Sequence, residues 1–268
     1  MNKKILSVPF LFWSALFIIV PLCMVFYYGM TDKTGTFTFQ NVLAIATAEH
    51  SKALWESIKL SLASTLICFL LAYPLAMILS QMNTSKNSFI VLIFILPMWM
   101  NFLLRTLAWQ TLLEKTGVIN SILNALHLPA LNIINTPTAI VLGMVYNFLP
   151  FMVLPIYNVL VKIDIHVVNA ARDLGANSFQ TFLKIIFPLS IPGVISGITM
   201  VFVPALTTFV ISKILGGSKI LLIGNVIEQE FTQTGNWHLG SGLSIVLMLF
   251  IIFIMVISAV TDKTGETV

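Results

Sequence analysis

The sequence predicts an all-α polytopic membrane protein, and three properties of its 268 residues support this fold class. Hydrophobic residues make up 58% of the chain and charged residues only 9%, whereas a soluble domain carries about 25% charged residues. Several apolar runs approach or exceed the length of about 18 residues that a helix needs to cross a bilayer. These runs are continuous rather than alternating, which excludes a closed membrane barrel.

The charge and the cysteines narrow the possible partners. The net charge is +4, and the 14 Lys and Arg residues are spread singly, so they form no basic patch suited to nucleic acid. A small positive excess is typical of cytoplasmic loops that face anionic membrane lipid. Cys23 and Cys68 both lie inside apolar runs, so we interpret them as small hydrophobic residues rather than a disulfide or a metal site.

The apolar runs predict six membrane-spanning helices within one transmembrane domain over residues 1–268. The first run follows Lys3 and Lys4, but it is too long for a signal peptide and lacks a small-residue cleavage site, so we expect an uncleaved span. Prolines inside the runs predict kinks, which membrane bundles tolerate. The expected spans cover residues 8–30, 57–80, 89–111, 137–161, 188–213 and 240–261.

The segment 162–187, between the fourth and fifth expected spans, predicts two short helices joined at a glycine. Asp164 can cap the first helix, and Gly175 can adopt the positive φ that ends it. Asn177 and Gln180 have the spacing of a capping box, which would open the second helix. Such a hairpin suits docking onto another protein. An amphipathic hairpin lying on the membrane surface is the alternative.

Motifs for catalysis are missing. The run Gly216-Gly217-Ser218-Lys219 lacks the spacing of a phosphate-binding loop, so this chain cannot hydrolyse ATP alone. Gly240-Ser241-Gly242 beside His238 makes an intramembrane serine hydrolase a remote alternative, but no histidine follows on a later helix to act as the base. There is no H-E-x-x-H motif and no cysteine pair for a metal. We therefore expect no enzyme activity and no cofactor in this chain. An ion-coupled transporter would need more intramembrane carboxylates than the sequence has.

Within the segment 164–192 the run Asn169-Ala170-Ala171-Arg172-Asp173-Leu174-Gly175-Ala176 is followed by Phe182, Ile185, Pro188 and Pro192. This run resembles the loop of ABC importer permeases, whose pattern is E-A-A-x-x-x-G followed about nine residues later by I-x-L-P. The resemblance implies the type I permease fold, with six spans, both termini in the cytoplasm, and a loop that docks onto an ATPase. Asn169 stands where the family usually has glutamate; it keeps hydrogen bonding but loses a charge that could pair with an arginine. The residues implied in coupling are Asn169, Ala170, Ala171, Asp173, Gly175, Ala176 and Pro188.

A second stretch, residues 96–109 followed by 115–120, resembles the permeases of spermidine/putrescine importers, and the likeness extends over most of the chain. It implies polyamine import by alternating access across the bacterial cytoplasmic (inner) membrane. The implied partners are a second homologous permease, two cytoplasmic ATPase subunits that hold ATP and Mg, and a periplasmic or lipid-anchored polyamine-binding protein. Importers of ferric iron share parts of the pattern, so ferric iron or another small solute is the alternative.

Polar and aromatic residues in the third and fourth expected spans predict the substrate pathway. Pro97, Asn101, Arg105 and Trp109 recur every four residues and would share one helix face, and intramembrane polar groups usually face the bundle interior or a water-filled path. Aromatic rings could receive an ammonium group. Alternatively, the tryptophans form an interfacial belt, and Arg105 snorkels outward or pairs with Glu114 or with a partner chain. The candidate pathway residues are Trp99, Asn101, Arg105, Trp109, Tyr146 and Asn147.

Overall fold

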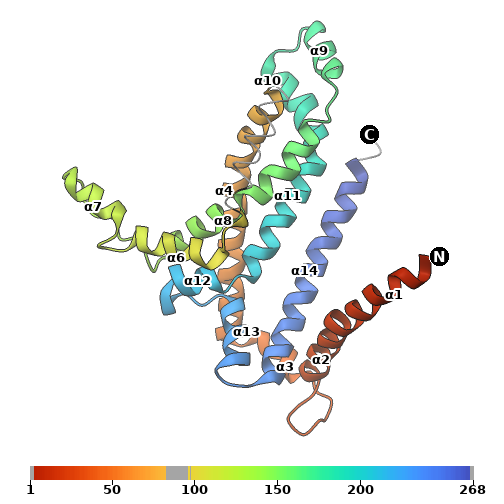
Figure 1. The fold of residues 1–268 in the computed structure, drawn as a ribbon, viewed down its shortest axis with the longest axis vertical. Coiled ribbons are helices and arrows are strands. Elements are labelled where there is room, and N and C mark those ends of the chain that lie inside the picture. Colours follow the sequence, from red (N-terminus) through yellow and green to blue (C-terminus); the bar gives the residue numbers. More distant parts are fainter. Residues whose placement is uncertain (1–2, 83–95, 97, 266–268) are drawn as a thin grey trace. The chain divides into compact units, whose positions relative to one another are not determined.

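The computed structural model describes residues 3–82, 96 and 98–265. Among these, five helices are long and apolar enough to cross a membrane (Figure 1). This confirms the prediction of an all-α polytopic membrane protein. Of the third expected span, 89–111, residues 89–95 and 97 lie outside the described residues; in the described part the helix α6 (Phe102–Leu113) begins only after Asn101 and is too short to cross a membrane by itself. The five helices cover Pro9–Gly29, Ala48–Gln81, Pro137–Leu160, Ser178–Thr207 and Trp237–Val260.

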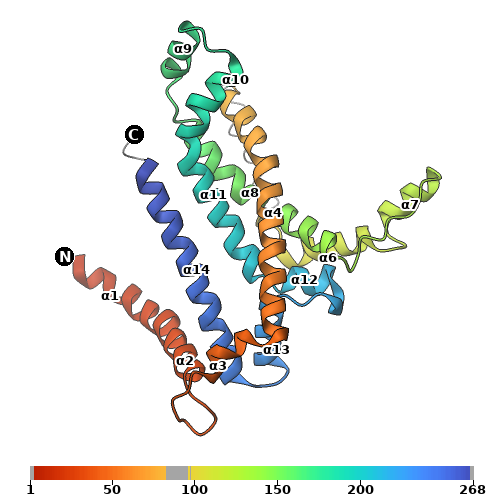
Figure 2. The same cartoon turned by 180° about the vertical axis from the view of Figure 1, so that it is seen from behind.

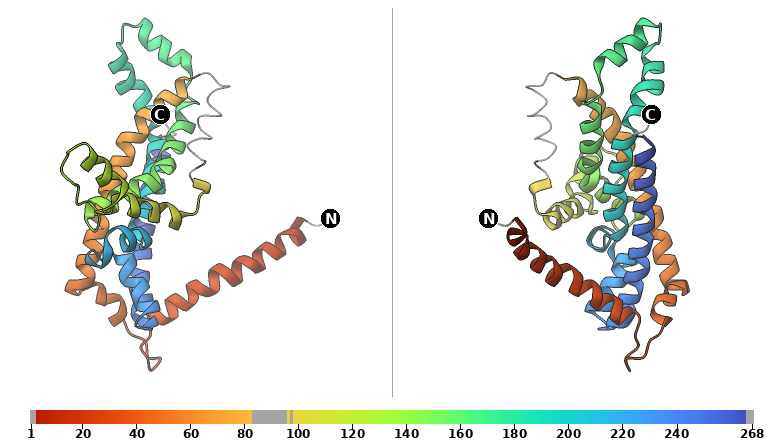
Figure 3. Two further views of the ribbon diagram at one scale, coloured as in Figure 1. Left: turned by 60° about the vertical axis from the view of Figure 1, so that its left-hand side comes forward. Right: turned by 90° about the vertical axis from the view of Figure 1, so that its right-hand side faces the viewer.

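The chain forms two compact units. The first comprises Met1–Leu54 and Ile223–Ile252, and the second comprises Trp55–Leu222 and Phe253–Val268. Helix α1 (Lys3–Ser14) of the first unit continues through a π-turn at Ala15–Ile19 into α2 (Val20–Gly29), as Figure 3 shows. The remaining helices of this unit are α3 (Gln40–Leu43), α13 (Ile223–Thr232) and the first part of α14 (Trp237–Gly265).

Glycines bring α2 and α14 close together inside the first unit. A Cβ atom on Gly29 would lie 3.1 Å from the carbonyl carbon of Ser241, and one on Gly242 would lie 2.5 Å from the backbone of Asn41. Small residues allow such close approach between membrane helices. The Gly240-Ser241-Gly242 motif therefore serves packing, since Ser241 itself is only 1% exposed.

The second unit contains most of the remaining helices, and Figure 2 shows α4, α8 and α11 running alongside one another. Helix α11 packs on α8 through two glycines one turn apart. A Cβ atom on Gly193 would lie 2.8 Å from the Pro155 carbonyl oxygen, and one on Gly197 would lie 2.7 Å from the Met152 sulfur. The helices are α4 (Ala48–Gln81), which belongs to this unit from Trp55 onward, α6 (Phe102–Leu113), α7 (Val118–Ala125), α8 (Pro137–Leu160), α9 (Ile165–Asp173), α10 (Ser178–Thr181), α11 (Phe187–Thr207) and α12 (Val210–Leu215).

Replacing Gly193 should loosen this packing. We expect Gly193→Val to lower the stability of the protein by about 1–3 kcal/mol, because the added side chain overlaps the α8 backbone. Thermal unfolding in detergent measures the change. Ile198→Val, on the same helix at a position 39% exposed, is the control and should shift the midpoint little. Equal midpoints for the two variants would contradict the close α8–α11 contact.

The fifth expected span, 188–213, is wrong at both ends. Helix α10 runs without a break through a π-turn at Phe182–Ile186 into α11, so the span begins at Ser178. Pro188 has no N–H to donate to the preceding turn of the helix. The π-helical turn at Phe182–Ile186 accommodates this missing hydrogen bond. In that turn the N–H of Phe187 donates to the Phe182 carbonyl. The span ends at Thr207, because Thr208 is extended with ψ of 136°.

Candidate functional site

The segment between α8 and α11 begins with a well-capped helix, α9. The Asp164 carboxylate accepts a hydrogen bond from the N–H of His166 at 2.9 Å, as expected for an N-cap. At the other end Gly175 has φ of 85°. The N–H of Gly175 donates to the Arg172 carbonyl at 2.9 Å, and the N–H of Ala176 donates to the Ala171 carbonyl at 3.1 Å. This pattern is a Schellman motif, so the prediction that Gly175 ends the helix is confirmed.

The turn after Gly175 is fixed by the predicted capping box. The backbone N–H of Asn177 donates to the side-chain oxygen of Gln180 at 3.0 Å, and the N–H of Gln180 donates to the Asn177 side chain at 2.8 Å. The second helix of the predicted hairpin is not separate, however, because α10 continues into the membrane span. Any force on the turn therefore acts directly on α11.

The turn also presents apolar side chains to its surroundings. Leu174 is 90% exposed and Phe179 is 69% exposed, whereas Val168 anchors α9 at 6%. A cavity of about 480 Å³ lies beside the helix, lined by Arg172, Val168 and the ends of α4 and α8. Exposed apolar residues clustered in this way are typical of a docking surface. Of the residues implied in coupling, Asn169, Ala170, Asp173, Gly175 and Pro188 are exposed, and Ala171 and Ala176 are half-buried.

Asn101 does not lie inside the helix that carries Arg105 and Trp109, so the expectation of one continuous helix face through all three is wrong, while a role of Asn101 in the pathway stays a prediction. Its backbone has ψ of 125°, outside the helical range, and α6 begins only at the next residue. The Asn101 side chain accepts hydrogen bonds from the N–H groups of Leu103 at 2.8 Å and Leu104 at 3.3 Å. It is the N-cap of α6. Pro97, predicted on the same face, lies outside the described residues.

A capping role makes a specific prediction for Asn101. We expect Asn101→Ala to cost about 1 kcal/mol of stability, while Asn101→Ser keeps most of it, because a serine hydroxyl can also cap. Thermal unfolding and transport measured on both variants check this. If the serine variant loses as much transport as the alanine variant, with its stability preserved, then the amide has a role beyond capping.

The structure brings two of the predicted aromatic residues together and leaves the third apart. The rings of Trp109 on α6 and Tyr146 on α8 have centroids 5.3 Å apart, edge to face. Tyr146 is 39% exposed, so one ring of the pair is accessible. Trp99 is 78% exposed, which suits the interfacial belt that was the alternative for the tryptophans.

Arg105 and Asn147 are both buried and incompletely hydrogen-bonded. Arg105 is 7% exposed and Asn147 is 1% exposed. The Asn147 amide donates to the Gly143 carbonyl at 2.8 Å, but its oxygen has no partner in the described protein, and neither do Nε and Nη1 of Arg105. The alternatives in which Arg105 snorkels outward or pairs with Glu114 are wrong. Elsewhere among the described residues, Lys59 forms an ion pair with Glu56 at 3.0 Å.

Sequence reasoning missed helix α12, which packs against both α6 and α8. A Cβ atom on Gly143 would overlap Leu215 and would lie 3.1 Å from Ile211, so α12 reaches the α8 backbone one turn from Asn147. The run Thr207-Thr208 interrupts the apolar pattern at the point where α11 ends. That interruption, together with Gly216-Gly217 after it, could have marked α12 as a separate element.

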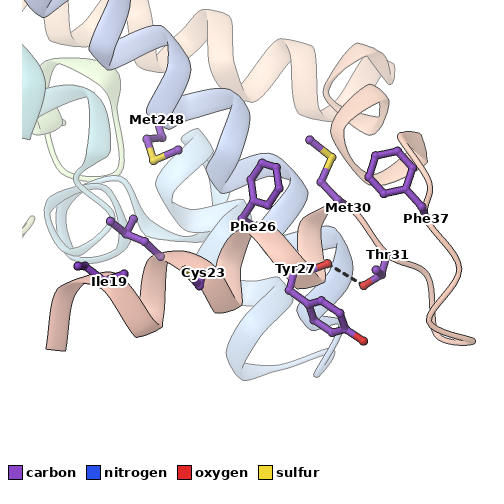
Figure 4. A pocket seen from close by; sticks show the side chains of 9 residues that line it. Ile19, Cys23, Phe26, Tyr27, Met30, Thr31, Phe37 and Met248 are labelled. Carbon is purple, nitrogen blue, oxygen red and sulfur yellow. Dashed lines mark hydrogen bonds between the residues drawn. The ribbon is translucent and has the colours of Figure 1, made fainter. Parts of the chain in front are cut away.

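A larger apolar groove of about 500 Å³ lies in the first unit (Figure 4). It is lined mainly by α2, with Phe37 from the following loop and Met248 from α14. The Thr31 hydroxyl donates to the Tyr27 carbonyl at 2.7 Å, which satisfies the polar group at its rim. The nine lining side chains carry no charge, so the groove offers nothing to balance an ionic substrate.

The hydrogen bonds of the His238 ring hold helices of the first unit together. Its Nδ1 lies 2.6 Å from the Thr31 carbonyl oxygen and 3.0 Å from the Tyr28 carbonyl oxygen. Carbonyl oxygens only accept hydrogen bonds, so Nδ1 is the ring nitrogen that carries a proton and donates it. A ring nitrogen used in this way ties α14 to the end of α2 and is not free to act as a base. The arrangement gives no support to a serine hydrolase.

The chain matches the family described as "Binding-protein-dependent transport system inner membrane component" over residues 3–263. It is 36% identical over 254 residues to the "Spermidine/putrescine transport system permease protein PotB" of Haemophilus influenzae, covering 90% of this chain and 88% of that protein. The protein of the same description from Escherichia coli is 35% identical over 245 residues, covering 88% and 89%.

A solved structure shares the fold. A chain in the crystal structure of a bacterial alginate ABC transporter, in complex with an alginate pentasaccharide-bound periplasmic protein, superimposes with a TM-score of 0.81. The match covers 95% of this chain and 91% of that chain at 15% sequence identity. At this identity the similarity concerns the fold alone.

Proposed function

The chain belongs to the family of binding-protein-dependent transport system inner membrane components, as a multi-pass permease subunit of an ABC importer, and we propose that it carries polyamines such as spermidine and putrescine into the cytoplasm. The observation that carries this substrate class is the similarity to two spermidine/putrescine permeases over about nine-tenths of the chain. Ferric iron or another small solute is the second candidate, favoured by the motif that iron importers share.

The proposed topology has six spans and places both termini in the cytoplasm. The sixth span stays a prediction from the apolar run 89–111, of which the structure describes residues 96 and 98–111, with a break at Asn101. Lys162, Arg172 and Lys184 all lie in the segment between α8 and α11, and such a cluster in a short loop favours the cytoplasmic side. The bacterial inner membrane is the proposed location, in line with the family description.

The proposed assembly pairs this chain with a second, homologous permease, two ATPase subunits and a polyamine-binding protein. The turn that follows α9 docks onto one ATPase through its exposed apolar residues, Leu174 and Phe179. Closure of the ATPases upon binding ATP shifts the turn, and the shift passes to α11 because the two are continuous. Asn169 replaces the usual glutamate, so this half of the permease contributes a neutral hydrogen bond rather than a charged one.

The proposed pathway passes the Trp109–Tyr146 ring pair and Asn147. The rings lie 5.3 Å apart and supply π-faces for an ammonium group. The unpartnered oxygen of Asn147 is an acceptor, which an ammonium donor would satisfy. No carboxylate is needed at this point, because a site for transient passage should bind the substrate weakly enough to release it.

ATP hydrolysis by the assembled complex tests the substrate class. The permease pair, the ATPases and the binding protein are reconstituted together, and the hydrolysis rate is measured with spermidine, putrescine or ferric citrate. We expect the polyamines to stimulate hydrolysis and ferric citrate to leave it at the basal rate. Stimulation by ferric citrate alone would replace the polyamine proposal with the iron alternative.

A further inference from the structure

The last part of α4 and the first turn of α11 are joined by a hydrogen bond between two buried side chains. The hydroxyl oxygen of Tyr73 on α4 lies 2.7 Å from Oγ of Ser190 on α11. Tyr73 is 6% exposed and Ser190 is 0% exposed. The Ser190 hydroxyl donates its own hydrogen to the Phe187 carbonyl at 2.9 Å, so the Tyr73 hydroxyl is the donor in the bond between the helices. Because this bond is shielded from water, it is stronger than an exposed one and ties the two helices together.

The Tyr73 ring also contacts the two phenylalanines that bracket the π-turn before α11. Its centroid lies 5.6 Å from that of Phe182, the first residue of the turn, and 5.7 Å from that of Phe187, the residue after it. Edge-to-face and tilted ring pairs at such distances add stabilisation beyond the area that they bury. Tyr73 therefore contacts this region at three points, two through its ring and one through its hydroxyl.

These contacts lie where a shift of the turn after α9 enters the membrane span. Helix α10 continues through the π-turn into α11 without a break, so the shift reaches Phe182, Phe187 and Ser190 in succession along one helix. A π-turn is a point at which a helix can bend, and a bend there would absorb part of the shift. Side chains that hold the turn from a neighbouring helix oppose such a bend.

We propose that Tyr73 is a positioning residue for coupling, which makes α4 move together with α11 when the ATPases close. The inference rests on the proposed docking of the turn after α9 onto an ATPase. Since α4 is long enough to cross a membrane, a displacement at this end is carried along the helix, and the shift of α11 becomes the shift of a pair of helices. Without the Tyr73 hydroxyl, α11 can move while α4 stays behind.

The amount of substrate carried per ATP tests this role. The complete complex is reconstituted in vesicles, and uptake of labelled spermidine and ATP hydrolysis are measured on the same sample. Tyr73→Phe removes the donor, keeps the ring contacts and leaves Ser190 bonded to Phe187. We expect this variant to lower the spermidine carried per ATP about 2- to 12-fold, the range that the loss of one neutral hydrogen bond allows. Lower stability alone would reduce uptake and hydrolysis together and leave their ratio unchanged.

Ser258→Ala is the matched control. Ser258 Oγ lies 2.8 Å from Oγ1 of Thr199, further along α11, and Thr199 likewise donates to its own helix, at the Ile195 carbonyl. The control thus removes a comparable hydroxyl contact to α11 away from the π-turn, and its ratio should match wild type. A Tyr73→Phe ratio at the wild-type value, or an equal loss in both variants, would overturn the proposal.

A measurement that does not depend on the substrate separates this role from the polyamine assignment. Spin labels at Leu62→Cys on α4 and Met200→Cys on α11, whose native side chains are 60% and 53% exposed, report the spacing of the two helices. Cys23→Ala and Cys68→Ala remove the native thiols, and the other subunits are made free of cysteine. The spacing is measured without nucleotide and after trapping with ATP and vanadate.

We expect trapping to leave this spacing unchanged when Tyr73 is present and to shift or broaden it in Tyr73→Phe. A spacing that changes with Tyr73 in place, or one that stays constant in Tyr73→Phe, would contradict the joint movement of α4 and α11. A wild-type complex that keeps the spacing but carries no spermidine would sink the polyamine assignment and leave the role of Tyr73 standing.

Discussion

Gly175→Val should reduce coupled transport while leaving the protein inserted in the membrane. The glycine has φ of 85° and ends α9, and a Cβ atom there would meet nothing within 4 Å. Valine therefore causes no clash, but a β-branched residue resists the left-handed conformation. Strain of roughly 1–3 kcal/mol would deplete the docking conformation about 5- to 150-fold. Labelled spermidine uptake and protein level in the membrane, measured together, check this.

Gly35→Val is the matched control for that variant. Gly35 has φ of 81° and likewise has no atom within 4 Å of a built Cβ, but it lies in the loop after α2. In that loop the Asp32 carboxylate accepts hydrogen bonds from Thr34 and Thr36, which hold the pKa of Asp32 well below its usual value. We expect near-normal uptake. Equal losses for the two variants would mean that valine at a positive φ harms the protein generally, and normal uptake with Gly175→Val would remove the coupling role.

Asn147→Leu should lower transport by about tenfold or more without destabilising the protein. Its amide bonds only to a carbonyl of its own helix, and its oxygen is unpartnered. Replacing an unsatisfied polar group by an apolar one of similar shape is close to neutral for stability. Loss of a hydrogen bond to an ammonium group costs about 1.5–3 kcal/mol, which sets the transport effect. Uptake kinetics and thermal unfolding give the two readouts.

Asn120 provides the contrast, because its hydrogen bonds are fully used within the protein. It is 5% exposed; its amide donates to the carbonyls of Glu114 and Leu131, and its oxygen accepts from the N–H of Leu131. Asn120→Leu should destabilise the protein by roughly 1–3 kcal/mol. An Asn147→Leu variant that is destabilised to the same degree would show that Asn147 is structural rather than part of the pathway.

Local capping chemistry made the segment after α8 predictable from the sequence. Asp164, Gly175 and the Asn177–Gln180 pair each act on residues two to four positions away, so their spacing alone determined the bonds now observed. The apolar run 137–161 was equally predictable, since its length matches a bilayer and Thr136 caps the helix that begins at Pro137.

The breaks inside apolar runs were not predictable in the same way. Hydropathy does not distinguish α11 from α12, so the turn at Thr208 and Phe209 was absorbed into one expected span. Asn101 was interpreted by its spacing to Arg105, although an asparagine before an apolar run can equally be an N-cap. Arg105 lies on α6, which packs against α8 and α12, and because those helices are distant in sequence no local pattern could reveal its unpaired state.

Uptake of labelled spermidine, in cells with and without this chain and with the rest of the transport system intact, tests the polyamine permease assignment most directly. Uptake should disappear without the chain and return when the chain is restored. Unchanged uptake in cells that lack the chain and have no second polyamine system would contradict the assignment.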